Sequence, residues 1–323
     1  MTRVLSYNIL VGGTRRIDAI EQMIRSADPD VVGLVEANDP NVVIELAQRL
    51  EMEYCMTGHG RHRTDWNTAM LSRLPILSTR KYDRPGVLNK PLLEARVQEE
   101  DGRELTVFVT HLSAAFSTGR GGESVRKPEV RELLRIMSAY QGTPHLLMGD
   151  FNALAPRDSL KASRLLRYLM ETDKLYQANP HVNTGHPYLD FVIPPSLRFL
   201  KPALRMIVRS DLLCTLFDKA GALYAPRGSI RLLLKAGYVD TYRRLHPHEW
   251  GFTCPAQIPA GRIDYIFASP ELAERLESCQ IWSEGNGLPG YKASDHLPVV
   301  ADFAMRVKAE EKRGLLATSG AAI

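Results

Sequence analysis

The feature that most constrains the fold is a short apolar run that recurs along the chain and ends each time on a polar residue. The runs are rich in Val, Leu and Ile and cover residues 3–9, 31–35, 105–110 and 144–148. After the first of them, Ile17, Ile20 and Ile24 recur at helical spacing. Strands that alternate with helices are typical of an α/β architecture. We therefore expect buried strands whose polar residues gather at their ends.

Polar side chains stand at the ends of these runs or beside two later ones at 262–267 and 297–303. They are Asn8, Glu36, His111, Asp150, Asn152, Asp264, Asp295 and His296. Taken alone, an Asp or Asn after a strand is most often a turn or a cap. The ends of strands are also where α/β enzymes assemble their sites. Six such placements in one chain favour a shared site over six separate turns.

The residue types favour a hard divalent cation and a phosphate. Carboxylate and amide oxygens, as in Glu36, Asp295 and Asn8, suit Mg²⁺ or Mn²⁺. Asp150 and Asn152 share one side of an extended chain, where one can accept a proton from water and the other can hold water or phosphate. The two histidines can donate to phosphate oxygens. The sequence has no HExxH or paired-cysteine zinc motif, no GxxxxGK[ST] loop and no GxSxG elbow.

The pieces around these residues resemble the motifs of the endonuclease/exonuclease/phosphatase superfamily, whose members include pancreatic-type DNase and abasic-site endonucleases. They are SYNIL, DVVGLVEA, VTHLS, MGDFNAL, GRIDYIF and SDHLPV, in the family's order from Met1 to about Phe303. Six motifs in order identify the family far better than any single one. The resemblance implies a four-layer α/β sandwich, with two mixed β-sheets packed face to face and helices outside. It also implies hydrolysis of a phosphoester with a divalent metal.

The resemblance further implies a metal shell. Glu36 is expected to be the principal ligand of Mg²⁺ or Mn²⁺, with Asn8 and Asp295 in the shell around metal and phosphate. Asn67 lies in WNTAMLSRLPI, which resembles a family strand, and is a candidate for contact with the substrate phosphate. The alternative for Asn67 is an ordinary turn or strand-start residue.

Catalytic roles carry over to the other motifs in the same way. The resemblance implies that Asp150 positions or deprotonates the attacking water with help from Asn152. It implies that His296 contacts the scissile phosphate and is oriented by Asp264. His111 is then a second group that contacts phosphate or acts as an acid.

Two positions depart from the family's pattern. Val35 stands where the family often has Gln before the glutamate. His111 stands where abasic-site endonucleases often lack a histidine, which favours the DNase-, sphingomyelinase- and phosphatase-like branches.

The function predicted from the sequence is a metal-dependent phosphoester hydrolase, a phosphodiesterase in the first place. Its substrate is either a nucleic acid or a phospholipid or inositol-type phosphate, because specificity in such folds depends on loops and insertions. The alternative is a non-catalytic module that kept the fold and binds membranes or nucleic acid. The filled catalytic positions argue against that alternative.

Length alone, 323 residues, suggests about two domains at ~150 residues each. Asn8 and His296 must meet in one site, however, so we predict a single catalytic domain over residues 1–306. It carries an insertion at about 158–224, and residues 307–323 are predicted to be a flexible tail. The insertion holds nine Lys or Arg and six Asp or Glu, so +3 of the net charge of +4 falls there.

Pro202 is expected to open a helix in this insertion, with Leu204, Ile207, Val208 and Leu212 on one side and arginines on another. A basic amphipathic helix can lie on an anionic membrane or flank a polyanion. The alternative, which we favour at this stage, is a surface helix with its apolar side on the core.

The sequence also suggests a compartment. Its four cysteines are Cys55, Cys214, Cys254 and Cys279, too scattered for a disulfide framework, as is typical of a reducing environment. The first residues lack the apolar stretch of a secretory signal, and no run approaches the ~20 apolar residues of a membrane span. We expect a cytoplasmic protein.

Overall fold

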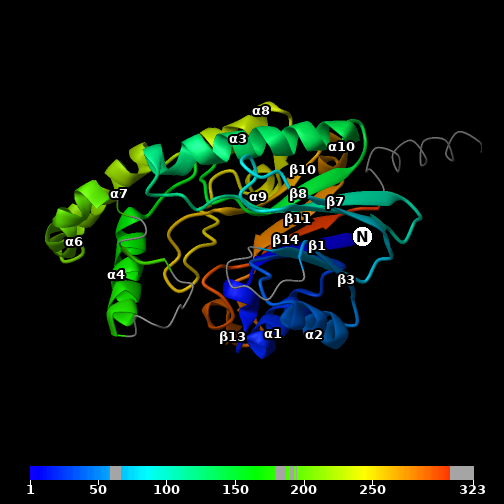
Figure 1. Cartoon of the computed structure of the whole chain (residues 1–323), viewed down its shortest axis with the longest axis horizontal. Helices are drawn as coiled ribbons and strands as arrows, with labels where there is room; N and C mark the ends of the chain where they lie inside the picture. Colours follow the sequence, from blue (N-terminus) through cyan, green and yellow to red (C-terminus); the bar gives the residue numbers. More distant parts are fainter. Residues whose placement is uncertain (59–66, 179–186, 190–192, 194, 306–323) are drawn as a thin grey trace, which may run out of the picture.

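The computed structural model describes residues 1–58, 67–178, 187–189, 193 and 195–305. Two six-stranded sheets form its centre (Figure 1). The first sheet has the strand order β11-β14-β1-β2-β4-β3. Its strands are β1 Thr2–Asn8, β2 Val31–Val35, β3 Glu53–Met56, β4 Thr68–Ser72, β11 Leu276–Ile281 and β14 Val299–Phe303.

The second sheet has the order β5-β6-β7-β8-β10-β9. Its strands are β5 Ile76–Tyr82, β6 Leu92–Gln98, β7 Glu104–His111, β8 His145–Asp150, β9 Val239–Asp240 and β10 Asp264–Ala268. Each sheet contains one parallel pair, β1 with β2 and β7 with β8, while the neighbouring strands are antiparallel. Both sheets are therefore mixed. A small separate hairpin pairs β12 Glu284–Gly285 with β13 Leu288–Pro289.

The two sheets pack face to face. Val4 and Val31 of the first sheet and Val107 and Leu146 of the second belong to one buried cluster. Gly33 in β2 lets the sheets approach closely, because a Cβ there would lie 2.5 Å from Cε of Met148 in β8. Burial of this apolar surface between the sheets is the main force that holds the layers together.

Helices cover the outer face of each sheet. The apolar sides of α1 (Ile17–Ala27) and α2 (Pro40–Leu50) bury a cluster against the first sheet. The helices α3 (Gly119–Met137) and α8 (Gly228–Lys235) do the same on the second. This arrangement confirms the predicted four-layer α/β sandwich. Two short helices, α9 (Thr241–Leu245) and α10 (Pro270–Ala273), and four 3₁₀ turns complete the connections: η1 Val11–Gly13, η2 Ser138–Tyr140, η3 Pro195–Leu200 and η4 Gly290–Lys292.

From the sequence, the polar, Gly-rich residues 117–127 predict a loop, and Pro128 predicts the first turn of a helix. The start of α3 differs from that prediction. The helix begins at Gly119, and Pro128 lies inside it. Tertiary contacts hold the additional turns, since Glu123 accepts hydrogen bonds from the backbone N–H and hydroxyl of Ser229 at 2.9 and 2.8 Å. The buried guanidinium of Arg126 donates to the Ser113 carbonyl at 2.9 Å. Local sequence does not reveal such partners.

The insertion forms a helical projection from one end of the sandwich, built of α4 (Ala162–Ala178), α6 (Lys201–Ile207) and α7 (Asp211–Tyr224) (Figure 1). The helix predicted to run through Leu212 is instead divided. The first part ends at Ile207, and Ser210 caps α7 by accepting from the Leu213 N–H at 3.4 Å. No helix in the described part of the chain is both long and apolar enough to cross a membrane. The predicted tail at 307–323 lies outside the described residues.

The topology brings the polar strand ends together. Asn8 is opposite Val35 at the end of the β1–β2 pair, and His111 is opposite Asp150 at the end of β7–β8. Because β10 is antiparallel to β8, its first residue, Asp264, also lies opposite Asp150. The carboxyl ends of the parallel strands in both sheets thus form one edge, where a site is expected.

Candidate active site

Asn8 connects the two sheets at this edge. Its Nδ2 donates hydrogen bonds to Glu36 Oε1 and to Asp150 Oδ2, each at 3.1 Å. Its Oδ1 accepts from the Leu10 N–H at 3.0 Å. Asn8 therefore presents N–H groups, rather than its oxygen, to the two carboxylates. Its predicted place in the shell of the metal stays a prediction.

Glu36 follows β2 directly and has a positive φ of 59°. Its Oε2 accepts the Val11 N–H at 2.7 Å, which fixes the carboxylate toward the site. Burial raises the pKa of Glu36, and the nearby negative charge of Asp295 raises it further. Two buried carboxylates that destabilise each other's charge are the donor set that a divalent cation would stabilise.

Asp150 ends β8 and is buried. Its Oδ1 accepts the Asn152 N–H at 2.8 Å, and Asn152 Nδ2 in turn donates to the Leu112 carbonyl at 2.9 Å. Burial and the charge of Asp264 raise the pKa of Asp150 to about 7. A carboxylate with a pKa near neutrality suits a general base.

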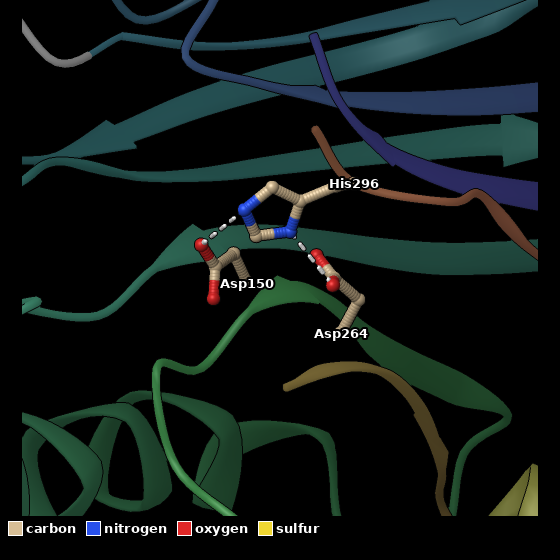
Figure 2. Close-up of side chains that lie close together, drawn as sticks. All are labelled: Asp150, Asp264 and His296. Carbon is tan, nitrogen blue, oxygen red and sulfur yellow. Dashed lines mark hydrogen bonds and ion pairs between the residues drawn. The ribbon is translucent and has the colours of Figure 1, made fainter. Parts of the chain in front are cut away.

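His296 and Asp264 form a buried pair beside Asp150 (Figure 2). The Nδ1 atom of His296 lies 2.8 Å from Asp264 Oδ2, and its Nε2 atom lies 3.9 Å from Asp150 Oδ2. Burial opposes a charge on His296, but the Asp264 carboxylate outweighs it and raises the pKa of the imidazole well above 6.5. His296 is therefore cationic, with Nε2–H directed toward the site.

His111 has the opposite protonation. Its Nε2 atom lies 3.5 Å from Asp150 Oδ2, and the ring is buried. Burial, helped by the positive charges of Lys90 and His296, lowers the pKa of His111 well below 6.5. The site thus places a neutral and a charged imidazole beside one carboxylate.

Asp295 is held by a contact from the insertion. Tyr168 of α4 donates its hydroxyl hydrogen to Asp295 Oδ2 at 3.3 Å. Both side chains are buried. Asp295 also acts electrostatically on Glu36, as its effect on the pKa of Glu36 shows. The predicted pair of Glu36 and Asp295 therefore shares one electrostatic environment.

Asn67 lies directly beside the glutamate. Its backbone carbonyl oxygen accepts the Ala37 N–H at 2.9 Å, and its backbone N–H donates to Asn38 Oδ1 at 3.2 Å. Within the part of the chain that is described, Asn67 Nδ2 is buried and has no hydrogen-bond partner. A buried donor without an acceptor is costly, which suits contact with a substrate oxygen. That role stays a prediction.

Sequence reasoning missed two residues of the site, Tyr168 and Lys90. Lys90 Nζ donates to the Leu112 carbonyl at 3.2 Å, and the charges of Glu36 and Asp150 act on it. Burial lowers the pKa of Lys90 to about 8. A single lysine before a strand and a tyrosine in a helix of an insertion give no local signal. Only the packing reveals them.

Metal-binding capacity is present at this edge. Asp150, Asp264 and His296 each offer a ligand atom, and these atoms lie within 4.8 Å of one another. His296 Nδ1 and Asp264 Oδ2 already pair with each other, however. The oxygen-rich side at Glu36 and Asp295 fits a hard cation such as Mg²⁺ better, since such ions prefer carboxylates. The residues present fit a divalent metal.

Comparison with solved structures finds proteins of the same fold. An AP endonuclease from Archaeoglobus fulgidus superposes with a TM-score of 0.60 at 17% identity, covering 94% of this chain and 99% of that one. A point variant of the 3′ phosphatase NExo from Neisseria, solved with a product DNA hairpin, gives 0.59 at 15% identity, covering 94% and 99%. At this identity the likeness shows the fold alone.

A curated DNA-(apurinic or apyrimidinic site) endonuclease from Arabidopsis thaliana is 36% identical over 89 residues. That match covers 24% of this chain and 24% of the plant protein, so the chain spans about a quarter of this relative's length. The prediction from His111, which argues against an abasic-site enzyme, is untested by these likenesses. The model of the Endonuclease/Exonuclease/phosphatase family matches residues 5–296. The chain is therefore a hydrolase that belongs to the endonuclease/exonuclease/phosphatase family.

Proposed function

We propose that the protein is a metal-dependent phosphodiesterase in which water attacks phosphorus in line with the leaving oxygen. The observation that carries this proposal is the setting of Asp150. Its carboxylate receives N–H groups from Asn8 and Asn152 and lies 3.5 and 3.9 Å from the Nε2 atoms of His111 and His296. A buried base flanked by one neutral and one cationic imidazole suits proton transfer beside an anionic substrate.

The residues divide the work by their charge. Asp150 takes the proton of the attacking water as the bond between phosphorus and the leaving oxygen breaks, and the departing alkoxide takes up a proton from solvent. The Asn152 N–H holds the Asp150 carboxylate in place. His296, kept cationic by Asp264, donates Nε2–H to a non-bridging phosphate oxygen in a charge-assisted hydrogen bond. Neutral His111 and Asn67 Nδ2 are further contacts for phosphate oxygens.

Glu36 and Asp295 would hold Mg²⁺ or Mn²⁺, and the Asn8 side chain would orient Glu36 by donating a hydrogen bond to its Oε1. When bound, the cation neutralises negative charge on the phosphate oxygens. Lys90 offsets part of the carboxylate charge, because it interacts electrostatically with Glu36 and Asp150.

Nucleic acid is the substrate class supported by the relatives, since AP endonucleases and a DNA-bound phosphatase share the fold. A phospholipid or inositol phosphate is the second candidate. One specific observation favours it, the exposed apolar surface of the insertion described below.

The experiment is hydrolysis of bis(p-nitrophenyl) phosphate and of a panel of DNA, RNA, inositol phosphates and sphingomyelin, with Mg²⁺, with Mn²⁺ and with chelator. We expect metal-dependent turnover that Asp150→Ala and His296→Ala each abolish while the circular dichroism spectrum stays native. Exposed Asp83, paired with Lys81, provides the matched control Asp83→Ala, which keeps full activity. Turnover that survives chelator or Asp150→Ala would refute the mechanism, and binding without turnover of any substrate would favour the non-catalytic alternative.

A further inference from the structure

The helix α7 is apolar on two opposite sides. Its inner side packs on α4, where Cys214 is buried, and a Cβ on Gly221 would lie 2.6 Å from Cβ of Ala162. Asp218 fixes the same side by accepting the Ser163 N–H at 2.7 Å. Intramolecular packing therefore accounts for one side of α7 and leaves the other unexplained.

The outer side carries leucines in a stripe. Leu212, Leu216 and Leu223 are spaced by four and seven residues, which places them in line on a helix of 3.6 residues per turn. They are 69%, 54% and 84% exposed. Two neighbours in the projection, Phe199 and Met206, are 75% and 63% exposed. Eight of the seventeen exposed large apolar side chains among the described residues lie between Phe199 and Tyr224, so the exposure is concentrated rather than scattered.

The same segment is basic. Residues 195–224 contain five Lys or Arg and two Asp, a net charge of +3. One of the two, Asp218, faces α4. Lys219 lies within the leucine stripe, where a long side chain can keep its ammonium at a polar boundary while its methylenes lie on apolar surface. Arg205 and Arg209 are exposed on the preceding segment. Exposed leucines flanked by Lys and Arg fit a partner that has an apolar interior under a negatively charged outer layer.

We infer that the surface formed by Phe199, Met206 and the α7 stripe is a docking site for anionic lipid bilayers. Aliphatic side chains that point outward between basic residues suit insertion among acyl chains beneath negative headgroups. A nucleic acid would be gripped by basic side chains interleaved with aromatic ones, whereas four of the five side chains of this surface are Leu or Met and Phe199 alone is aromatic. A second copy of this chain would bring two surfaces of charge +3 together, which disfavours self-association.

The position of this surface connects it to the site. Figure 1 shows that α4, α6 and α7 project from the end of the sandwich that lies opposite the amino terminus. β1 starts near the amino terminus and runs toward that opposite end, where its last residue is Asn8. α4 also contacts the site directly, through Tyr168 and Asp295. Docking through α7 therefore brings the catalytic edge near the lipid surface. The inference is separate from the proposed hydrolysis, because docking needs neither metal nor substrate.

The test is flotation of the full chain, without metal or substrate, with vesicles of phosphatidylcholine alone and of phosphatidylcholine with an equal share of phosphatidylglycerol. We expect binding to the anionic vesicles, and a drop of more than about tenfold for the combined variant Leu212→Ser, Leu216→Ser and Leu223→Ser. These side chains are exposed, so the fold is retained. The control with Leu77→Ser, Val87→Ser and Leu245→Ser removes three exposed apolar side chains elsewhere and binds like wild type.

Charge is tested separately with Arg205→Glu, Arg209→Glu and Lys219→Glu combined, which should abolish the preference for phosphatidylglycerol. Asp150→Asn should bind vesicles like wild type, which distinguishes docking from hydrolysis. The inference is wrong if the leucine variant floats like wild type, or if wild type binds neither vesicle. It is also wrong if the leucines prove to form a dimer interface in sedimentation experiments, or if the charge reversal weakens only binding to a DNA oligonucleotide.

Discussion

The Tyr168 hydroxyl donates to Asp295 Oδ2 at 3.3 Å, and this hydrogen bond joins the insertion to the edge that carries the candidate active site. Burial and the negative charge of Asp295 both raise the pKa of Tyr168, so the hydroxyl stays protonated and remains a donor. Such a contact orients a carboxylate that the family resemblance places near the metal. A helix outside the six motifs thus takes part in the site.

Tyr168→Phe is expected to raise the metal concentration needed for half-maximal activity by about tenfold, because groups that orient ligands tune metal affinity. The measurement is a Mg²⁺ titration of the hydrolysis rate. Tyr176, exposed on the same helix and stacked on Tyr188, provides the matched control Tyr176→Phe. An unchanged titration for Tyr168→Phe would mean that the hydrogen bond serves packing alone.

Asp264→Asn is expected to lower kcat by about 10³–10⁴-fold, by analogy with other aspartates that orient a histidine. The amide removes the charge that holds His296 in its cationic form, while the shape of the side chain is kept. Steady-state kinetics with the aryl phosphodiester measure the loss. Asp101→Asn, which alters an exposed ion pair with Arg103, is the control. A kcat within threefold of wild type would contradict the proposed role of the pair.

Lys90→Met is expected to lower turnover by about 100-fold, the scale of losing one charged group that faces a reacting oxyanion. The ammonium acts on Glu36 and Asp150, and burial lowers its pKa to about 8. Lys90→Arg keeps the charge and should recover part of the rate. Calorimetry of both variants gives their melting temperatures and so shows whether the folded state is destabilised. If Lys90→Met and Lys90→Arg lose the same amount of rate and the same amount of melting temperature, the role of Lys90 is structural.

Arg262→Met is expected to destabilise the fold by about 3–5 kcal/mol, because it leaves buried Asp240 without its cation and buried Asp158 with Arg243 alone. The Arg262 guanidinium donates to Asp240 at 2.7 and 2.6 Å and to Asp158 at 3.0 Å, and all three side chains are buried. Urea unfolding followed by circular dichroism gives the free energy. Arg135→Met, which removes an exposed pair with Glu132, should leave the midpoint unchanged. A loss below about 1 kcal/mol for Arg262→Met would rule out this account.

Stability is expected to fall as the pH drops below 6.5, in part through His145. Burial lowers the pKa of His145 below 6.5, although its bond to the Thr143 carbonyl opposes this. The folded state then binds the proton more weakly than the unfolded state, so the contribution is complete above pH 6.5 and is lost on acidification. His145→Gln should make the free energy of unfolding change less between pH 7 and pH 5 than it does in the wild type. Exposed His248→Gln should not, and an equal slope in both would refute the assignment.

Much of the fold and the site was predictable from the strand-end pattern. Asn8, Glu36, His111, Asp150 and Asp264 lie at or next to the ends of strands, as expected from apolar runs that stop at a polar residue. The family resemblance supplied the pairing of the sheets. The start of α3 at Gly119 was not predictable, because glycines disfavour a helix locally and distant partners such as Ser229 hold it.

The sequence by itself determined which strand-end side chains lie at the edge of the candidate site, since the length of an apolar run and the polar residue that ends it are local properties of the chain. Only the tertiary structure decided their charge states and neighbours. It made His296 cationic beside Asp264 and His111 neutral through burial, and it brought Lys90 to Glu36. It also turned one side of α7 outward. Burial and electrostatic coupling depend on segments that are far apart in the chain, so no local pattern encodes them.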